Sequence, residues 1–220
     1  VVVDQIYADY LLDIVVGAEV LYLWHPDGSS PVDADGSGST AGDFTTLGAS
    51  DRAYWGGPTV ADLDGGTKEI IGSTWDTKGV YVFDLAGQSK PGWPVTLGDN
   101  MYSAVAAADL QGDGLKELVV GSNGYSIYAL RANGTELMDG DSNPATLGVF
   151  KRMEAMWNFA APTLAPLQND GTNAIVYGAA DKHLYAWRYD GSNLPGFPVH
   201  LKAGVSSSAA VGSLDGPAGP

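Results

Sequence analysis

Cysteine is absent from the 220 residues of this chain. A disulfide framework, a thiolate metal site and a cysteine nucleophile are therefore excluded. A chain of this length does not depend on such cross-links, because it can bury a substantial hydrophobic core within one domain. Any chemistry must come from oxygen, nitrogen and aromatic groups.

Basic residues are scarce. Lys and Arg together number 11 against 26 Asp and Glu, which gives a formal net charge of -15. A chain with this charge repels the phosphates of nucleic acids and the headgroups of anionic lipids. We therefore expect no nucleic-acid partner and no binding to an anionic membrane surface.

Long apolar runs are missing as well. Asp4, Asp9, Asp13 and Glu19 interrupt the apolar N-terminal region, and no uncharged apolar stretch reaches the ~18 residues of a membrane-spanning helix. We expect no membrane insertion. The chain begins at Val1 rather than at a methionine, which predicts a processed or truncated product.

Glycine is abundant, with 30 residues, which indicates many turns. The hydrophobic share of 45% is too high for a disordered acidic chain. These two features together predict a folded, turn-rich domain.

Two strand-like segments recur four times along the chain. The first occurs as Asp13–Gly17, Glu69–Gly72, Glu117–Gly121 and Ala174–Gly178, and the second is centred on Tyr22, Tyr81, Tyr128 and Tyr185. Glycine-containing hairpin turns follow the second segment. A period of about fifty residues indicates a repeat architecture.

Each pair of segments is preceded by a small-residue strand, such as Ala104–Leu110, and two pairs are followed by a proline-bounded edge strand, at 91–95 and 195–199. Four-stranded sheets repeated at this period are the blades of a β-propeller, and the alternating pattern excludes a helical solenoid. We therefore predict an all-β fold, a β-propeller of four-stranded antiparallel blades. One domain spans 1–220, with repeats at 1–53, 54–100, 101–157, 158–204 and, in part, 205–220.

Two long segments interrupt the repeats, at 29–53 and 138–157. Long loops in a compact β domain are either functional or disordered, and we expect ligand contacts from these two. The part from Phe150 to Trp157 is predicted to form one or two helical turns. The acidic stretches Asp33–Gly38 and Asp139–Asn143 are predicted to be solvated loops.

The six tryptophans are predicted to pack between blades, with Trp93 at the wide outer rim. A platform on which sugar rings stack is the alternative, and it stays open for Trp55 and Trp157. Both of these lie where a loop meets a strand.

The order of inner strand, acidic loop and two apolar strands resembles the FG-GAP repeat family, also described as integrin α-like or VCBS-type. Trp55-Gly-Gly-Pro58 and Phe159-Ala-Ala-Pro162 are similar to the motif that names the family. The resemblance covers the whole chain as four repeats and the opening of a fifth. It implies a propeller of about seven blades, with calcium bound in the loops between first and second strands. Because four repeats are fewer than seven, we expect a fragment of a longer propeller; closure as a small ring and completion by other chains are the alternatives.

The third repeat carries a nearly complete calcium-ligand set. Calcium takes six to eight oxygens, and a loop with acidic groups at its first, third and fifth positions, a glycine at the sixth and a distal carboxylate can wrap it. The expected ligands are Asp109, Gln111, Asp113, the carbonyl of Leu115, and Glu117. Gln111 offers a neutral amide oxygen, which is expected to weaken affinity without abolishing it.

The loop of the second repeat keeps Asp62, Asp64 and Glu69 but is one residue shorter. An ordinary Asx turn explains its sequence as well as a metal site does. Asp4, Asp9 and Asp13 make a weaker set in the first repeat, and the fourth repeat is expected to be metal-free because its end carboxylates are lost. Asp215 lies in a loop that the sequence does not complete.

Catalytic motifs are not found. His25, His183 and His200 form no zinc-protease pattern, and no nucleophile elbow is present. We therefore expect a non-catalytic, calcium-binding propeller that serves as an adhesion, ligand-binding or scaffold module. Its ligand is expected to be a protein or a carbohydrate at a loop face. The resemblance implies an extracellular or cell-surface location. The alternative is the propeller of an extracellular polysaccharide-degrading enzyme, as a lyase or a carbohydrate-binding accessory domain.

Overall fold

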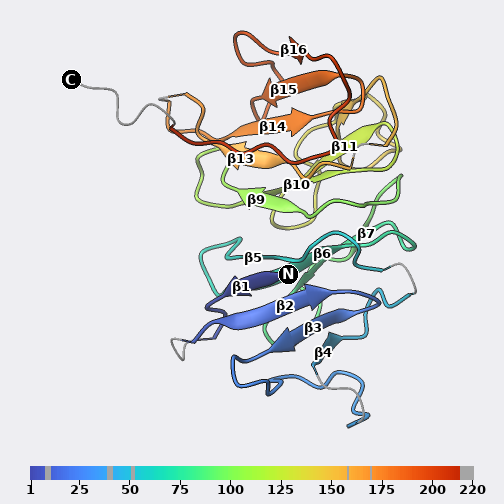
Figure 1. The fold of residues 1–220 in the computed structure, drawn as a ribbon, viewed down its shortest axis with the longest axis vertical. Coiled ribbons are helices and arrows are strands. Elements are labelled where there is room, and N and C mark those ends of the chain that lie inside the picture. The colour runs from blue at the N-terminus through green and yellow to red at the C-terminus, as the bar shows by residue number, and fades with distance from the viewer. Residues whose placement is uncertain (8–10, 39–41, 51–52, 158, 169, 214–220) are drawn as a thin grey trace, which may run out of the picture.

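The computed structural model describes residues 1–7, 11–38, 42–50, 53–157, 159–168 and 170–213. Within these ranges the chain forms four antiparallel sheets of four strands each (Figure 1) and no helix, so none that could cross a membrane. The all-β prediction is confirmed for these residues. Four sheets packed in succession are consistent with a propeller-like arrangement.

The four strands of each sheet lie side by side in chain order. Sheet 1 contains β1 (Val2–Asp4), β2 (Asp13–Gly17), β3 (Leu21–Trp24) and β4 (Asp43–Thr45). Sheet 2 contains β5 (Thr59–Ala61), β6 (Glu69–Ser73), β7 (Gly79–Phe83) and β8 (Val95–Thr96). Sheet 3 contains β9 (Ala106–Ala108), β10 (Glu117–Gly121), β11 (Ser126–Leu130) and β12 (Val149–Arg152). Sheet 4 contains β13 (Thr163–Ala165), β14 (Ala174–Gly178), β15 (His183–Trp187) and β16 (Val199–His200).

The hydrophobic core lies between successive sheets. Phe44 of sheet 1 meets Phe83 of sheet 2 edge to face, with ring centroids 6.0 Å apart, and Phe150 of sheet 3 meets Trp187 of sheet 4 at 5.9 Å. The middle strands β6, β7, β10 and β11 are buried along their whole length because both faces of their sheets are covered. Their central residues are therefore mostly apolar rather than alternating, and polar side chains stand at their ends. The first strands β1, β5, β9 and β13 contact one another in this order, which the small side chains of Ala106–Ala108 permit.

The six tryptophans divide into three groups, one of which, Trp24 and Trp75, is half-buried. Trp93 and Trp187 are buried, and the indole Nε1 of Trp93 donates to the carbonyl of Ala132 in the next sheet at 3.1 Å. Their predicted packing between blades is confirmed. Trp55 and Trp157 are 43% and 58% exposed, so that prediction does not hold for them.

The helical turns predicted for Phe150–Trp157 are not formed. Val149–Arg152 is instead β12, the fourth strand of sheet 3, and pairs with β11 through Tyr128 and Val149. Phe150 is fully buried. Pairing with β11 and burial of the Phe150 ring outweigh the local helix propensity of the sequence. The segment 29–53 likewise supplies a strand, β4, to sheet 1.

Residues 205–213 lie against sheet 4 as the start of a further repeat would. Val205 N–H donates to Ala179 at 2.9 Å and the Thr163 hydroxyl donates to Ala209 at 2.6 Å. Two equivalent bonds join sheets 2 and 3: the N–H of Met101 donates to the carbonyl of Thr74, and the hydroxyl of Thr59 donates to the carbonyl of Val105. No strand is formed in this described stretch, although the sequence predicts the start of a fifth repeat at 205–220.

The antiparallel order places the chain's connections on two opposite faces. The connections between first and second strands, residues 5–12, 62–68, 109–116 and 166–173, are called loops 1 to 4. Side chains join them in series, since Lys68 of loop 2 bonds to Gln5 O, Lys116 of loop 3 to Asp62 O and Asn173 of loop 4 to Asp109 O. They define the acidic-loop face. The joints that lead into each next sheet lie on the other face.

Candidate functional site

Loops 1 to 3 each end at a buried carboxylate in the first position of the second strand. Asp13, Glu69 and Glu117 are 0%, 0% and 1% exposed. Each accepts backbone N–H groups of its own loop: Asp13 from Ile6, Glu69 from Leu63 at 3.0 Å, and Glu117 from Leu110 at 2.8 Å. These bonds satisfy part of the buried charge and close each loop over its end residue.

Loop 3 is folded around Asp109. The Asp109 carboxylate accepts the N–H groups of Gly112 at 2.6 Å and Gly114 at 2.8 Å. Gly112 and Gly114 have φ of 76° and 87°, a backbone conformation that side chains disfavour. Burial raises the pKa of Asp109, but these backbone hydrogen bonds outweigh it and hold the pKa below its ordinary value. The loop is thus built around an ionised carboxylate.

Negative charge accumulates in loop 3 without a basic partner. Burial raises the pKa of Glu117, and the carboxylates of Asp113 and Asp109 raise it further. Among the described residues no Lys, Arg or His side chain pairs with any of these three carboxylates. Arg131 lies beside the loop, but its guanidinium donates to the carbonyls of Glu136 and Leu137.

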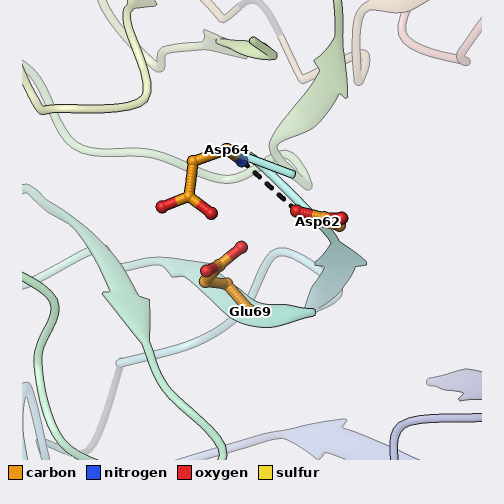
Figure 2. Close-up of side chains that lie close together, drawn as sticks. All are labelled: Asp62, Asp64 and Glu69. Atoms are coloured by element: carbon orange, nitrogen blue, oxygen red, sulfur yellow. Dashed lines mark hydrogen bonds between the residues drawn. The ribbon is translucent and has the colours of Figure 1, made fainter. Parts of the chain in front are cut away.

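Loop 2 gathers three carboxylates. Oxygens of Asp62, Asp64 and Glu69 lie within 4.8 Å of one another (Figure 2). Asp62 also caps its own loop, accepting the N–H of Asp64 at 3.3 Å, the dashed line in Figure 2, and of Gly65 at 2.8 Å. The three predicted ligands of this loop are therefore brought together.

A lysine of the same sheet enters this carboxylate group. Lys90 Nζ lies 2.5 Å from Glu69 Oε1 and 3.1 Å from Asp64 Oδ2. The hydrogen bond to Glu69 raises the pKa of Lys90. The carboxylates of loop 2 thus already hold an ammonium. Among the described residues, the carboxylates of Asp109, Asp113 and Glu117 in loop 3 are not brought together within 4.8 Å as those of loop 2 are. Sequence reasoning missed Lys90, which lies 21 residues after Glu69.

Loops 1 and 4 also hold basic side chains. His25 Nδ1 lies 2.7 Å from Asp13 Oδ1 in loop 1, and Lys68 Nζ lies 2.8 Å from Asp4. Asp9, the remaining candidate of that loop, and Asp215 lie outside the described residues. In loop 4, Arg188 donates to Gln168 Oε1 at 2.5 Å.

A cavity of about 440 Å³ opens between loops 2 and 3. Its lining includes Asp64 and Lys90 from one side and Asp113, Leu115 and Glu117 from the other. Four of the eight predicted ligands thus border a common space.

The two acidic stretches predicted to be solvated loops, Asp33–Gly38 and Asp139–Asn143, are hydrogen-bonded turns. Asp33 accepts the N–H of Gly36, and Asp141 pairs with Arg152.

The opposite face carries a row of aromatic rings. Trp55, Tyr102 and Phe159 each lie four residues before the first strand of sheets 2, 3 and 4. The centroids of Trp55 and Tyr102 are 5.0 Å apart, and so are those of Tyr102 and Phe159. Trp75 and Trp157 contact the row, 4.9 Å from Tyr102 and 5.8 Å from Phe159.

This aromatic row was only partly predicted, through Trp55 and Trp157. Tyr102 is 36% exposed, so it is open to solvent like Trp55 and Trp157, which makes three exposed rings on this face. The repeated position of Trp55, Tyr102 and Phe159 is the signal that could have found the row in the sequence. Each of the two long segments expected to contact a ligand reaches both faces. Residues 29–38 and 138–148 precede a fourth strand on the acidic-loop face, whereas 46–50 and 153–157 follow one on the opposite face.

The histidines show no catalytic arrangement in the described residues. His183 and His200 face each other in sheet 4, with Nε2 and Nδ1 3.3 Å apart. His183 Nδ1 lies 3.4 Å from Asp181. His25 is on a different sheet, bonded to Asp13.

No family model matches the chain, and no curated protein matches it. Several solved structures are similar to the chain. The chain is similar to the computationally designed protein Ika8, with TM-score 0.50 and 15% identity over 91% of this chain and 50% of that one. It is also similar to BBS1N, a propeller crystallised in complex with ARL6DN, with TM-score 0.52 and 12% identity over 92% of this chain and 55% of that one. The chain therefore spans about half the length of these structures, and the likeness concerns the fold alone.

Proposed function

We propose that this chain is a non-catalytic binding module of a propeller, with calcium in loop 3 and a ligand-binding surface at the aromatic row. The observation that carries the proposal is the alignment of Trp55, Tyr102 and Phe159 at equivalent joints of three sheets, with adjacent centroids 5.0 Å apart. Buried packing does not need these rings, because Trp55 and Tyr102 are 43% and 36% exposed. Exposed aromatic groups of this density mark interaction surfaces.

The row favours a carbohydrate ligand. Tryptophan and tyrosine present flat apolar faces with a polar edge, which suits a sugar ring with C–H groups on one side and hydroxyls around it. The backbone beneath the rings is fixed, because Asn100 Nδ2 donates to Trp75 O at 2.7 Å and Trp157 N–H donates to Asn123 O at 3.1 Å. Fixed rings lose little conformational entropy when a ligand binds. A protein ligand is the other candidate in this proposal.

Calcium would be held in loop 3 by Asp109, Gln111, Asp113, the Leu115 carbonyl and Glu117. Their oxygens are the ligands that calcium prefers. Burial raises the pKa of Glu117, and the carboxylates of Asp113 and Asp109 raise it further. The ion would supply the positive charge that this loop lacks. Its part in the function is to hold the loop in one conformation.

A secreted or cell-surface location follows from the same chemistry. Loops of this kind in extracellular modules bind calcium with Kd of roughly 10⁻⁴ to 10⁻³ M, which requires the millimolar calcium found outside cells. A module of this kind would serve adhesion, ligand capture or scaffolding beside further blades or other chains. This proposal gives the chain no nucleic-acid ligand.

A glycan array probed with the full chain, together with a lyase assay by absorbance on acidic polysaccharides, tests the proposal. Retention of a glycan without cleavage is expected, and Trp55→Ala or Tyr102→Ala should abolish it. Tyr189→Ala is the matched control, because Tyr189 is a comparably exposed aromatic residue, 38%, on the acidic-loop face. Cleavage would favour a polysaccharide-degrading enzyme, and binding that survives both substitutions would refute the aromatic surface.

A further inference from the structure

We infer that the ammonium of Lys90 is the resident cation of loop 2, so that this loop takes up a divalent ion only when Lys90 is removed. The inference builds on the proposed calcium-binding function and separates the loop that needs a free ion from one that carries its own. It is carried by the position of Lys90 among the carboxylates of Asp64 and Glu69.

The ammonium lies where a loop cation would be bound. Lys90 Nζ is in hydrogen-bonding contact with Glu69 Oε1 at 2.5 Å and Asp64 Oδ2 at 3.1 Å, and both belong to the carboxylate group of Figure 2. Calcium also binds carboxylate oxygens, at about 2.3–2.6 Å. An ion sharing Glu69 and Asp64 with Lys90 would therefore be only a few ångströms from a positive charge.

Lys90 is an exception within the repeat. Its N–H donates to Val82 O, as the N–H of Leu137 does to Ala129 O and that of Leu194 to Ala186 O. The equivalent position in sheets 3 and 4 is therefore a leucine. Both leucines are buried, at 5% and 4% exposure, and neither can supply a charge. Among sheets 2 to 4, sheet 2 alone therefore carries a charged side chain at this position.

The shorter loop suits an ammonium. Asp62 to Glu69 has one residue fewer than Asp109 to Glu117, and the acidic residue lost is the one that corresponds to Asp113. A calcium ion in loop 2 would lack that ligand, whereas an ammonium carries a single charge and is satisfied by three acceptors. Each loop still holds three carboxylates, because Asp64 stands where loop 3 has Gln111, and only loop 2 adds an ammonium to them.

The side chains that reach loops 2 and 3 from the next loop along the chain also differ in charge. Lys116 adds a second ammonium to loop 2 by donating to Asp62 O at 2.5 Å. At the equivalent contact with loop 3 the donor is Asn173, a neutral amide, 2.8 Å from Asp109 O. Among the described residues, the three carboxylates of loop 3 therefore have no basic partner, whereas Lys90 pairs with two carboxylates of loop 2.

A tethered ammonium is a strong competitor. A group held by a short flexible link reaches a local concentration of the order of millimolar, comparable to the calcium concentrations at which extracellular modules are filled. Lys90 is also held by its backbone bond to Val82, so it returns to the loop whenever an ion leaves. Removing the side chain should expose the carboxylates to solution ions.

The test is isothermal titration of calcium into the full chain, its Lys90→Met and Lys90→Arg variants, and its Asp64→Asn and Asp113→Asn variants. The wild-type chain is expected to bind one ion, in loop 3, and Lys90→Met to gain a second. Lys90→Arg keeps the positive charge and should gain none. In the wild-type background Asp64→Asn should leave calcium affinity unchanged, while Asp113→Asn should lower it by about tenfold or more.

Two results would overturn the inference. One is a Lys90→Met chain that folds and binds no more calcium than the wild type. The other, which does not depend on that variant folding, is a loss of calcium affinity on Asp64→Asn as large as that on Asp113→Asn. If the wild type binds no calcium and Lys90→Met binds one ion, the calcium part of the proposed function fails and the role of Lys90 stands.

Discussion

Glu69 and Glu117 occupy the same position in neighbouring sheets, each at the start of a second strand, but their charges are balanced differently. Glu69 Oε1 lies 2.5 Å from Lys90 Nζ, whereas no basic side chain among the described residues pairs with Glu117. Both carboxylates are buried and both bond to one loop N–H. Lys90 therefore balances the charge of Glu69, whereas in the proposed function a bound cation would balance that of Glu117.

The same substitution should have opposite effects at these two positions. In metal-free protein, Glu117→Gln removes an unbalanced buried charge and should stabilise the fold by on the order of 1 kcal/mol. Glu69→Gln leaves Lys90 without its nearest partner and should destabilise the fold by about 1–3 kcal/mol. The loss is smaller than for a fully buried pair because the Lys90 side chain is partly exposed. Urea unfolding in EDTA measures both changes. Equal effects at both positions would contradict the charge difference.

The effect of Glu117→Gln should depend on pH. Burial raises the pKa of Glu117, so the proton-bound form adds stability that is fully present below the ordinary glutamate value, about 4.3, and is lost as pH rises through the raised value. Without metal, Glu117→Gln should therefore have a higher free energy of unfolding than the wild type at neutral pH. The difference should shrink as the pH falls to the ordinary glutamate pKa. Unfolding in EDTA at a series of pH values tests this, and a constant difference would argue against an ionised Glu117.

Calcium should stabilise the chain through loop 3. A ligand that binds only the folded state at ten times its Kd adds about 1.4 kcal/mol, which corresponds to about 3–6 °C in melting temperature for a chain of this size. The shift between EDTA and calcium should be lost in Asp113→Asn. Magnesium at the same ionic strength is the control, because it fits a loop of flexible oxygens poorly.

Placing a lysine on loop 3 should weaken its calcium site. Asn173 lies where Lys68 and Lys116 reach the preceding loop, so Asn173→Lys should bring an ammonium to Asp109. Calcium affinity is expected to fall by about tenfold, and metal-free stability to rise. Asn173→Gln, which stays neutral, is the control. Unchanged affinity in Asn173→Lys would show that the charge around the loop does not determine ion binding.

Glycan binding should depend on the aromatic row rather than on the ion. Phe159→Ala removes the last equivalent ring and should weaken a glycan that spans the row by about tenfold, since each stacked aromatic side chain contributes roughly 1–2 kcal/mol. Addition of EDTA should change this affinity little, because loop 3 is on the opposite face. Affinity that falls with EDTA and not with Phe159→Ala would place the ligand at the acidic loops.

The sequence was sufficient for the repeating sheets, because each second strand carries a Glu-Ile-Ile-Gly type pattern and each third strand a central tyrosine. Tyr81 and Tyr128 lie in β7 and β11 as the pattern predicts. It was not sufficient for β12, where Phe150–Arg152 has helical propensity and pairing with β11 prevails. Fourth strands of two to four residues have too little pattern to set their bounds: those predicted at 91–95 and 195–199 form at Val95–Thr96 and Val199–His200.

The candidate site was predictable only in part. The carboxylates of loops 2 and 3 follow a spacing that a sequence shows directly, and Asp62, Asp64 and Glu69 do converge. Lys90 could not be found in this way, because its contact with Glu69 depends on how the chain after β7 folds back along the sheet. The same holds for Asn173, whose contact with Asp109 joins two repeats.

The most direct measurement is a crystal structure of the full chain grown with millimolar calcium, in which anomalous scattering identifies the ions. The account predicts one calcium coordinated by Asp109, Asp113 and Glu117, with Lys90 still bonded to Glu69 and no ion in loop 2. An ion coordinated by Asp62, Asp64 and Glu69 with Lys90 displaced, or loop 3 free of calcium, would contradict it.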